Sequence, residues 1–193
     1  MKIDFANMAR SAFAFLTDDE GFCVVHSGGE RVRFESKSVY VEVLFDAQRS
    51  FEVGVQIGLA DSLGPGKERP FSLSEILRLR RIPDTDILEG AQATTKSVLG
   101  TLLAALARKT RDHARDFLSG DADSYRELAS FRELETESYA QEQRLRYMRA
   151  DADAAWTAKD YLAVIKAYGS SPSLLTASER KRLEYAKKQV AKR

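Results

Sequence analysis

The side chains that most often carry catalysis near neutral pH are scarce in this chain. The sequence has two histidines, His26 and His113, and a single cysteine, Cys23. A nucleophile and its base need a third group that orients them, and no such set stands together here. We interpret both histidines as structural. Cys23 alternates with Phe22 and Val24 in a strand-like run, which indicates a small buried or half-buried side chain.

Motifs for metals and cofactors do not emerge either. One cysteine and two distant histidines fall short of a zinc site. Asp121, Asp123 and Glu127 cluster where a helix is expected to begin, and acids there serve as N-caps and dipole partners. The glycines at 64 and 66 lack the Gly-Lys-Ser/Thr ending of a phosphate-binding loop. We therefore expect no metal, no cofactor and no enzymatic activity.

The chain is organised around alternating apolar runs between residues 22 and 59. Residues 39–46 and 51–59 alternate strictly, and shorter runs at 22–25 and 31–34 precede them. Alternation with period two places one set of side chains on each face of a strand. The connections are short enough for hairpins, which predicts a four-stranded antiparallel meander with one apolar face.

The other face of this predicted sheet carries charged and polar side chains. Antiparallel sheets commonly have one wet face, so a solvated surface with cross-strand ion pairs is one interpretation. A protein-binding face is the other, and Gly54 and Gly58 would allow close approach there. The candidate protein-binding residues are Arg31, Arg33, Tyr40, Glu42, Glu52 and Gln56.

Helical periodicity accounts for most of the remaining sequence. Apolar spacing predicts a helix at 4–16 that covers the sheet, and Ser72 with Glu75 has the form of a capping box for a short helix. After a loop at 61–70 and a linker at 84–92, helices are expected over the ranges 94–118, 122–150, 151–168 and 176–190. The fold class is thus α+β, with a sheet domain at 1–92 and a helical domain at 93–193.

Charge is distributed unevenly along the chain. Residues 1–92 are net acidic and residues 93–193 net basic, although the whole sequence carries a formal charge of only +1. The basic candidates on the last helix are Arg180, Lys181, Lys187 and Lys188. Such side chains can contact phosphates non-specifically, which makes nucleic-acid association the alternative function. Cations near the end of a helix also suit its dipole without any ligand.

Four segments carry a resemblance to known proteins: RFES at 33–36, VYVEV at 39–43, SFEVGVQIGL at 50–59 and PFSLSEILRL at 70–79. Over residues 1–82 the chain resembles small, uncharacterised bacterial α+β proteins, some of which appear to serve as immunity partners of secreted toxins. The pattern of Trp156, Tyr161, Tyr168 and Leu183 within 151–190 resembles a single tetratricopeptide-like helix pair. The resemblance implies binding to another protein and assigns no catalytic residue.

No stretch approaches the run of about 18 apolar residues that a membrane helix needs. The N-terminus lacks the apolar core of a signal peptide, and a single cysteine rules out an internal disulfide, so cytoplasmic residence is the expectation. We expect a bacterial protein-interaction module with an unidentified protein partner. Self-association through the long helices is a further option, and nucleic acid is a less favoured partner.

Overall fold

A computed structural model describes residues 4–60, 69–83 and 90–192 of the chain. Most of the loop expected at 61–70 and of the linker expected at 84–92 lies outside the described residues. The chain divides into two compact units, Met1–Arg132 and Glu133–Arg193. The boundary between them falls within one long helix, α6 (Ala122–Thr157).

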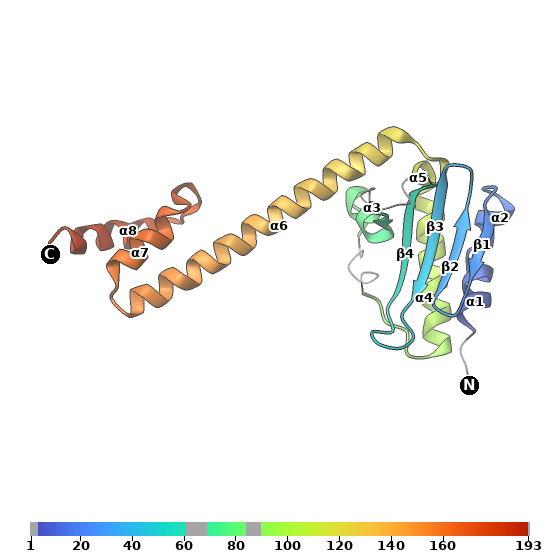
Figure 1. Cartoon of the computed structure of the whole chain (residues 1–193), viewed down its shortest axis with the longest axis horizontal. Coiled ribbons are helices and arrows are strands. Elements are labelled where there is room, and N and C mark those ends of the chain that lie inside the picture. Colours follow the sequence, from blue (N-terminus) through green and yellow to red (C-terminus); the bar gives the residue numbers. More distant parts are fainter. Residues whose placement is uncertain (1–3, 61–68, 84–89, 193) are drawn as a thin grey trace. The chain divides into compact units, whose positions relative to one another are not determined.

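Five strands form one antiparallel sheet in the order β1-β2-β3-β4-β5 (Figure 1). Their bounds are Cys23–Ser27, Arg31–Glu35, Val39–Phe45, Val53–Leu59 and Phe71–Ser72. The first four are the predicted meander. The fifth was not predicted, because two residues are too few to show a period of two. Its Phe71 and Ser72 pair with Ile57 and Gln56 of β4.

The inner face of the sheet supports one hydrophobic core. Val39, Val41, Val43 and Phe45 are at most 2% exposed and belong to the core, as their alternation in β3 predicts, but Tyr40 and Glu42 on the other face are buried as well. Figure 1 shows α1 (Phe5–Ala12) and α4 (Lys96–His113) on one side of the sheet. The ring of Phe5 packs against that of Phe45, with centroids 5.4 Å apart, so the first helix does cover the sheet as expected.

Two helices that the periodicity predicts as continuous are interrupted. Phe13 separates α1 from α2 (Ala14–Asp18), and Ala114 separates α4 (Lys96–His113) from α5 (Arg115–Ser119). Both residues leave helical geometry, with ψ of 20° and 17°, and both are fully buried. Phe13 packs on Phe34 of the sheet, with ring centroids 6.2 Å apart. Tertiary packing therefore overrides the local helical preference.

The first unit contains helices that the sequence pattern assigned to a separate helical half. Leu99, Leu103, Phe117, Tyr125 and Leu128 belong to the same buried cluster as the inner face of the sheet. The physical reason is area, since α1 alone cannot cover five strands and their apolar side chains must be buried against another layer. The sheet unit accordingly extends through Arg132, beyond the boundary expected at 92/93.

A short helix, α3 (Leu73–Leu79), begins at the predicted capping box. Ser72 Oγ accepts from the backbone N–H of Glu75, and Glu75 Oε2 accepts from the backbone N–H of Ser72 at 2.7 Å. Arg132 of α6 joins this cap, donating from Nε to Glu75 Oε1 at 2.6 Å and from Nη2 to the carbonyl of Pro70 at 2.8 Å. Its guanidinium also lies 3.8 Å above the ring of Phe71. One arginine thus joins α6, β5 and α3.

The second unit has its own small core. The C-terminal part of α6 is followed by α7 (Tyr161–Gly169), a turn of 3₁₀ helix (Pro172–Leu174) and α8 (Ala177–Val190). The predicted cap of the last helix, Thr176 with Glu179, is present. The buried residues are Met148, Ala152, Val164, Tyr168, Leu175, Leu183 and Ala186. Two helices, α7 and α8, lie within the range 151–190 where a helix pair was expected, but the break expected after residue 150 is wrong, because residues 151–157 continue α6.

Candidate functional site

Four of the six predicted protein-binding residues are gathered on the outer face of the sheet. Arg33 lies at the centre, donating from Nη1 to Glu42 Oε1 at 3.2 Å and from Nε to Glu35 Oε2 at 3.1 Å. Arg31 reaches the same oxygen of Glu42 at 3.4 Å. Cross-strand register explains the pairing, because Arg33 of β2 is directly opposite Glu42 of β3. These charges compensate one another within the chain.

Tyr40 completes this ionic cluster from the side of β4. The guanidinium of Arg33 lies 3.9 Å from its ring centroid, and its ring lies against Gly58, its cross-strand neighbour. Burial raises the pKa of Tyr40, as does the charge of Glu42, while Arg33 lowers it. Tyr40 is 3% exposed and Glu42 is 9% exposed. Both belong to the outer face as predicted, but little of either can touch a partner.

The other two predicted residues lie apart from the ionic cluster. Glu52 is exposed and forms an isolated bridge with Gln92 beside the start of β4. Gln56 is half-buried between Glu42 of β3 and Ser72 of β5. The six residues therefore form no continuous patch of accessible charge.

The basic residues of α8 are partly engaged by the chain itself. Arg180 donates from Nε to the carbonyl of Leu175 at 3.1 Å, and Lys187 pairs with Glu184 at 3.0 Å. Lys181 and Lys188 are exposed. They are seven residues apart and so lie on one face of the helix. Two such lysines make a small phosphate-binding footprint.

The two histidines and the single cysteine are not all gathered in one place. His26 is exposed in β1, and His113 is half-buried at the end of α4. Cys23 is exposed, so the expectation of a buried or half-buried side chain was wrong. Its strand lies at the edge of the sheet, where side chains keep more contact with solvent. Among the described residues no cluster of three His, Cys, Asp or Glu side chains could hold a metal ion.

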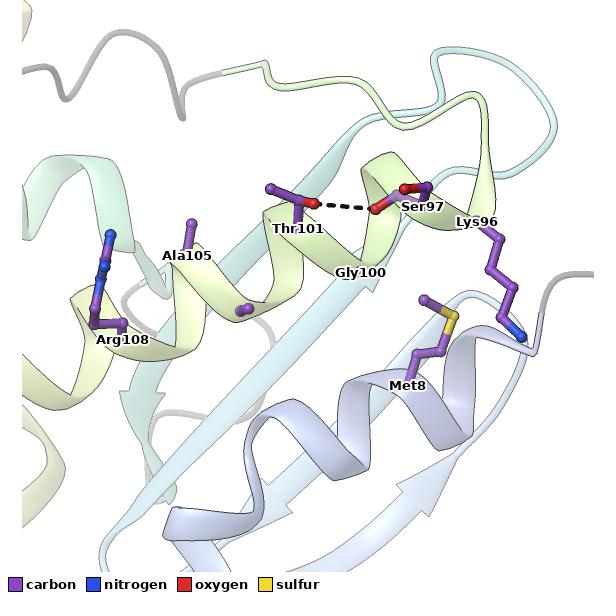
Figure 2. Close-up of a pocket in the computed structure, with 8 residues that line it drawn as sticks. Met8, Lys96, Ser97, Gly100, Thr101, Ala105 and Arg108 are labelled. Atoms are coloured by element: carbon purple, nitrogen blue, oxygen red, sulfur yellow. Dashed lines mark hydrogen bonds between the residues drawn. The ribbon is translucent and has the colours of Figure 1, made fainter.

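An open hollow lies between α1 and α4 (Figure 2). Met8 points from α1 toward Gly100 of α4, and the hydroxyl of Thr101 bonds back to the carbonyl of Ser97 at 3.2 Å. Arg108 lies on α4 at the far end from Ser97. The residues that line it include no carboxylate or thiol, so they offer neither a general acid–base pair nor a metal-binding set.

None of the described helices is long and apolar enough to span a membrane.

One accessible surface was missed by the sequence analysis, namely the first strand. All five residues of β1 are exposed, including Val24 at 37% and Val25 at 55%. In the described part of the chain β1 pairs only with β2, so its other edge has no strand partner. The register shifts between Val24 and His26, which is a bulge or irregularity. The meander itself held the signal, because its first strand must lie at an edge.

A shallow groove accompanies this edge on the inner side of the sheet. Val24 and Phe34 line its floor, and residues of the first two helices line its wall, among them Asn7, Arg10 and Thr17. The groove has a volume of about 390 Å³. Arg10 is exposed and makes no ion pair within the described residues. An uncharged strand edge and an uncompensated cation thus lie side by side.

Comparison of the chain with family models, with curated proteins and with solved structures gives no significant match. Arguments about function therefore depend on the geometry of these surfaces.

Proposed function

We propose that this chain is a non-enzymatic protein-interaction module that takes up an extended segment of a partner protein along the edge of β1. The observation that carries the proposal is the exposure of all five residues of that strand, which has no charged side chain. Folded proteins usually block such an edge with lysine, proline or a covering helix. Within the part of the chain that the structure describes, no strand pairs with this edge and a register shift is its one irregularity, which favours strand addition by a partner.

The surroundings of β1 indicate the chemistry of that segment. Backbone hydrogen bonds to β1 would supply affinity, and successive side chains of the partner segment would point to opposite faces of the sheet. Val24 and Val25 suit apolar side chains. Arg10, which lines the groove beside Val24, is exposed and makes no ion pair within the described residues. The expected segment is therefore extended, rich in β-branched residues and acidic.

The outer face of the sheet is a weaker candidate for the same function. Arg33 and Glu42 are largely buried and already paired, so a partner would have to compete with existing ion pairs. The nucleic-acid alternative depends mainly on Lys181 and Lys188, which make a small phosphate-binding surface.

The resemblance to immunity proteins implies that the partner is a secreted toxin, and we propose this class of partner for the β1 edge.

A peptide-display selection tests the function on the full chain. Random linear peptides are selected on the wild type, and the enriched sequences are synthesised and titrated against two variants. Val25→Lys places a charge on the β1 edge. Val98→Lys is the matched control, since Val98 is 43% exposed on α4, far from the edge in sequence. We expect acidic, β-branched peptides whose Kd rises at least tenfold with Val25→Lys and stays unchanged with Val98→Lys.

Equal binding to both variants would reject the β1 edge. A DNA duplex is titrated in parallel at low salt as the competing probe. If the duplex bound tightly and Lys181→Glu with Lys188→Glu abolished that binding while no peptide was enriched, the nucleic-acid alternative would replace the proposal.

A further inference from the structure

Among the described residues, the part of α6 between Phe131 and Leu145 packs on neither hydrophobic cluster. The buried cluster of the first unit ends with Phe131 as its last packed residue, and that of the second begins at Leu145. Tyr139, which lies between Phe131 and Leu145, is 65% exposed. Tyr147, two residues after Leu145, is 68% exposed. A single helical segment of this length gains little stability from hydrogen bonds alone in water. Such a segment is better stabilised when another surface covers it.

Charge is segregated along residues 133–149 of α6. The part up to residue 142 carries the acids Glu133, Glu135, Glu137 and Glu142, and the part from residue 144 carries Arg144, Arg146 and Arg149. Arg149 pairs with Glu179. Glu137, Glu142, Arg144 and Arg146 make no ion pair within the described residues, and Arg144 donates only to the carbonyl of Ala140 in its own helix. The segment is thus acidic at one end and basic at the other.

Uncharged residues follow one stripe of the same segment. Ala140, Gln143, Tyr147 and Ala150 are separated by three, four and three residues, which is the spacing of a coiled-coil seam. The two alanines permit close approach of a second helix. Glu137 and Arg144 flank the stripe on one side, and Tyr139 and Arg146 flank it on the other. The stripe and its borders therefore have the form of an unpartnered helix–helix interface.

We propose that a second copy of this chain covers the segment, and that residues 133–150 of two chains pair as an antiparallel, two-fold symmetric coiled coil. In that arrangement the acidic half of each helix lies against the basic half of the other. A parallel pair would superpose like charges, which is unfavourable. The antiparallel register sets Glu137 of one chain opposite Arg144 of the other. Tyr139 then faces Arg146 as a cation–π pair, and symmetry produces each contact twice.

Sedimentation equilibrium of the full chain at increasing concentration tests this pairing. The wild type is expected to show a reversible monomer–dimer equilibrium. Glu137→Lys and Arg144→Glu each replace two attractive contacts by two repulsive ones, so each should raise the dimer Kd about tenfold or more. The double variant, Glu137→Lys with Arg144→Glu, exchanges the charges and should restore the wild-type Kd. Only an antiparallel register brings these two positions together.

Glu127→Lys is the matched control, because Glu127 is an exposed acid of the same helix outside the segment. It should leave the dimer Kd unchanged, and circular dichroism should show equal helix content in every variant. A chain that stays monomeric up to millimolar concentration would overturn the proposal. A double variant that dimerises no better than the single variants would also overturn it. The measurement needs no ligand at β1, so its failure is distinct from that of the proposed function.

Discussion

Arg33 illustrates how a residue predicted for binding can be used for folding instead. Its side chain is 13% exposed and contacts Glu35, Glu42 and the ring of Tyr40. One nitrogen, Nη2, is buried without a hydrogen-bond partner. A buried guanidinium that is incompletely satisfied depends strongly on its remaining counterions. Substitutions in the ionic cluster should therefore change the stability of the fold more directly than they change partner binding.

Replacement of the shared counterion tests this at one position. Glu42→Gln removes the charge that Arg31 and Arg33 share, and we expect the free energy of unfolding in urea to fall by about 2 kcal/mol. Glu52→Gln is the matched control, an exposed glutamate on the same face of the sheet, and should change stability by less than about 0.5 kcal/mol. Equal effects of the two substitutions would mean that the cluster contributes nothing to the fold.

Glu75 provides a residue-scale prediction for pH. Burial raises its pKa, but hydrogen bonds from Arg132 and from the backbone and hydroxyl of Ser72 outweigh that effect, so the net shift is downward. A carboxylate with a lowered pKa binds fewer protons in the folded chain than in the unfolded one. The ionised carboxylate of Glu75 therefore stabilises the fold at pH values above its unfolded pKa of about 4.3. That contribution is lost as the pH falls through the folded pKa.

We expect Glu75→Gln to cost about 1–2 kcal/mol at neutral pH. The gap between wild type and variant should narrow as the pH is lowered through about 4 toward about 3, because protonation removes the same charge from the wild type. Chemical denaturation at several pH values measures it. A gap that stays constant over this range would show that the carboxylate's charge is not what stabilises the cap.

Capping residues were the most predictable single positions in the chain. Ser72 with Glu75 and Thr176 with Glu179 form the reciprocal hydrogen bonds that their spacing predicts, because a capping box is entirely local. Cys23 was mispredicted for the opposite reason. Alternation in sequence identifies the two faces of a strand, but whether either face is covered depends on residues far away in the chain.

At the scale of elements, period and length decided what the sequence could show. Strands of five to seven residues were predicted from their alternation, whereas the two-residue β5 has no detectable period. The interruptions at Phe13 and Ala114 were missed because both residues are apolar and suit a continuous helix. Buried packing holds the breaks, and packing is a tertiary property.

The pairing of β3 with β4 yields a prediction at this scale. A Cβ atom at Gly58 would come within 2.7 Å of the ring of Tyr40, whereas a Cβ at Gly54 would meet nothing within 4 Å. Gly58→Ala must displace the ring and is expected to lower the unfolding free energy by about 1–3 kcal/mol. Gly54→Ala, on the same face of the same strand, should leave stability unchanged or slightly higher.

Thermal and urea denaturation of both alanine variants give the comparison. If Gly58→Ala were as stable as Gly54→Ala, the close contact between the Tyr40 ring and β4 would be wrong.

At the scale of the whole molecule, the two hydrophobic clusters should respond separately to mutation. Trp156 contacts Tyr161 and Tyr185 in the second unit, with ring centroids 6.0 and 5.5 Å apart. Trp156→Ala should remove about 2 kcal/mol or more from the stability of that unit. Amide hydrogen exchange should quicken in α7 and α8 and remain unchanged in β3 and β4. Faster exchange in the strands as well would indicate one cooperative unit.

The sequence predicted the α+β class but not where the first compact unit ends. Its helical periodicity locates α4, yet only the uncovered inner face of the sheet explains why α4 packs there. The β1 edge was missed in the same way, since its availability depends on which elements are absent around it. The predicted protein-binding residues of β2, β3 and β4 were assigned to the correct face, but the pattern could not show that Arg31, Arg33 and Glu42 compensate one another.

The central claim is that a partner's extended segment pairs with β1. Amide hydrogen exchange of the full chain, with and without a peptide from the display selection, tests it most directly. We predict that the peptide slows exchange within Cys23–Ser27 and leaves α8 unchanged, because added strands protect backbone amides at the edge they join. A peptide that binds but leaves these amides unprotected, with its protection confined to another surface, would contradict the claim.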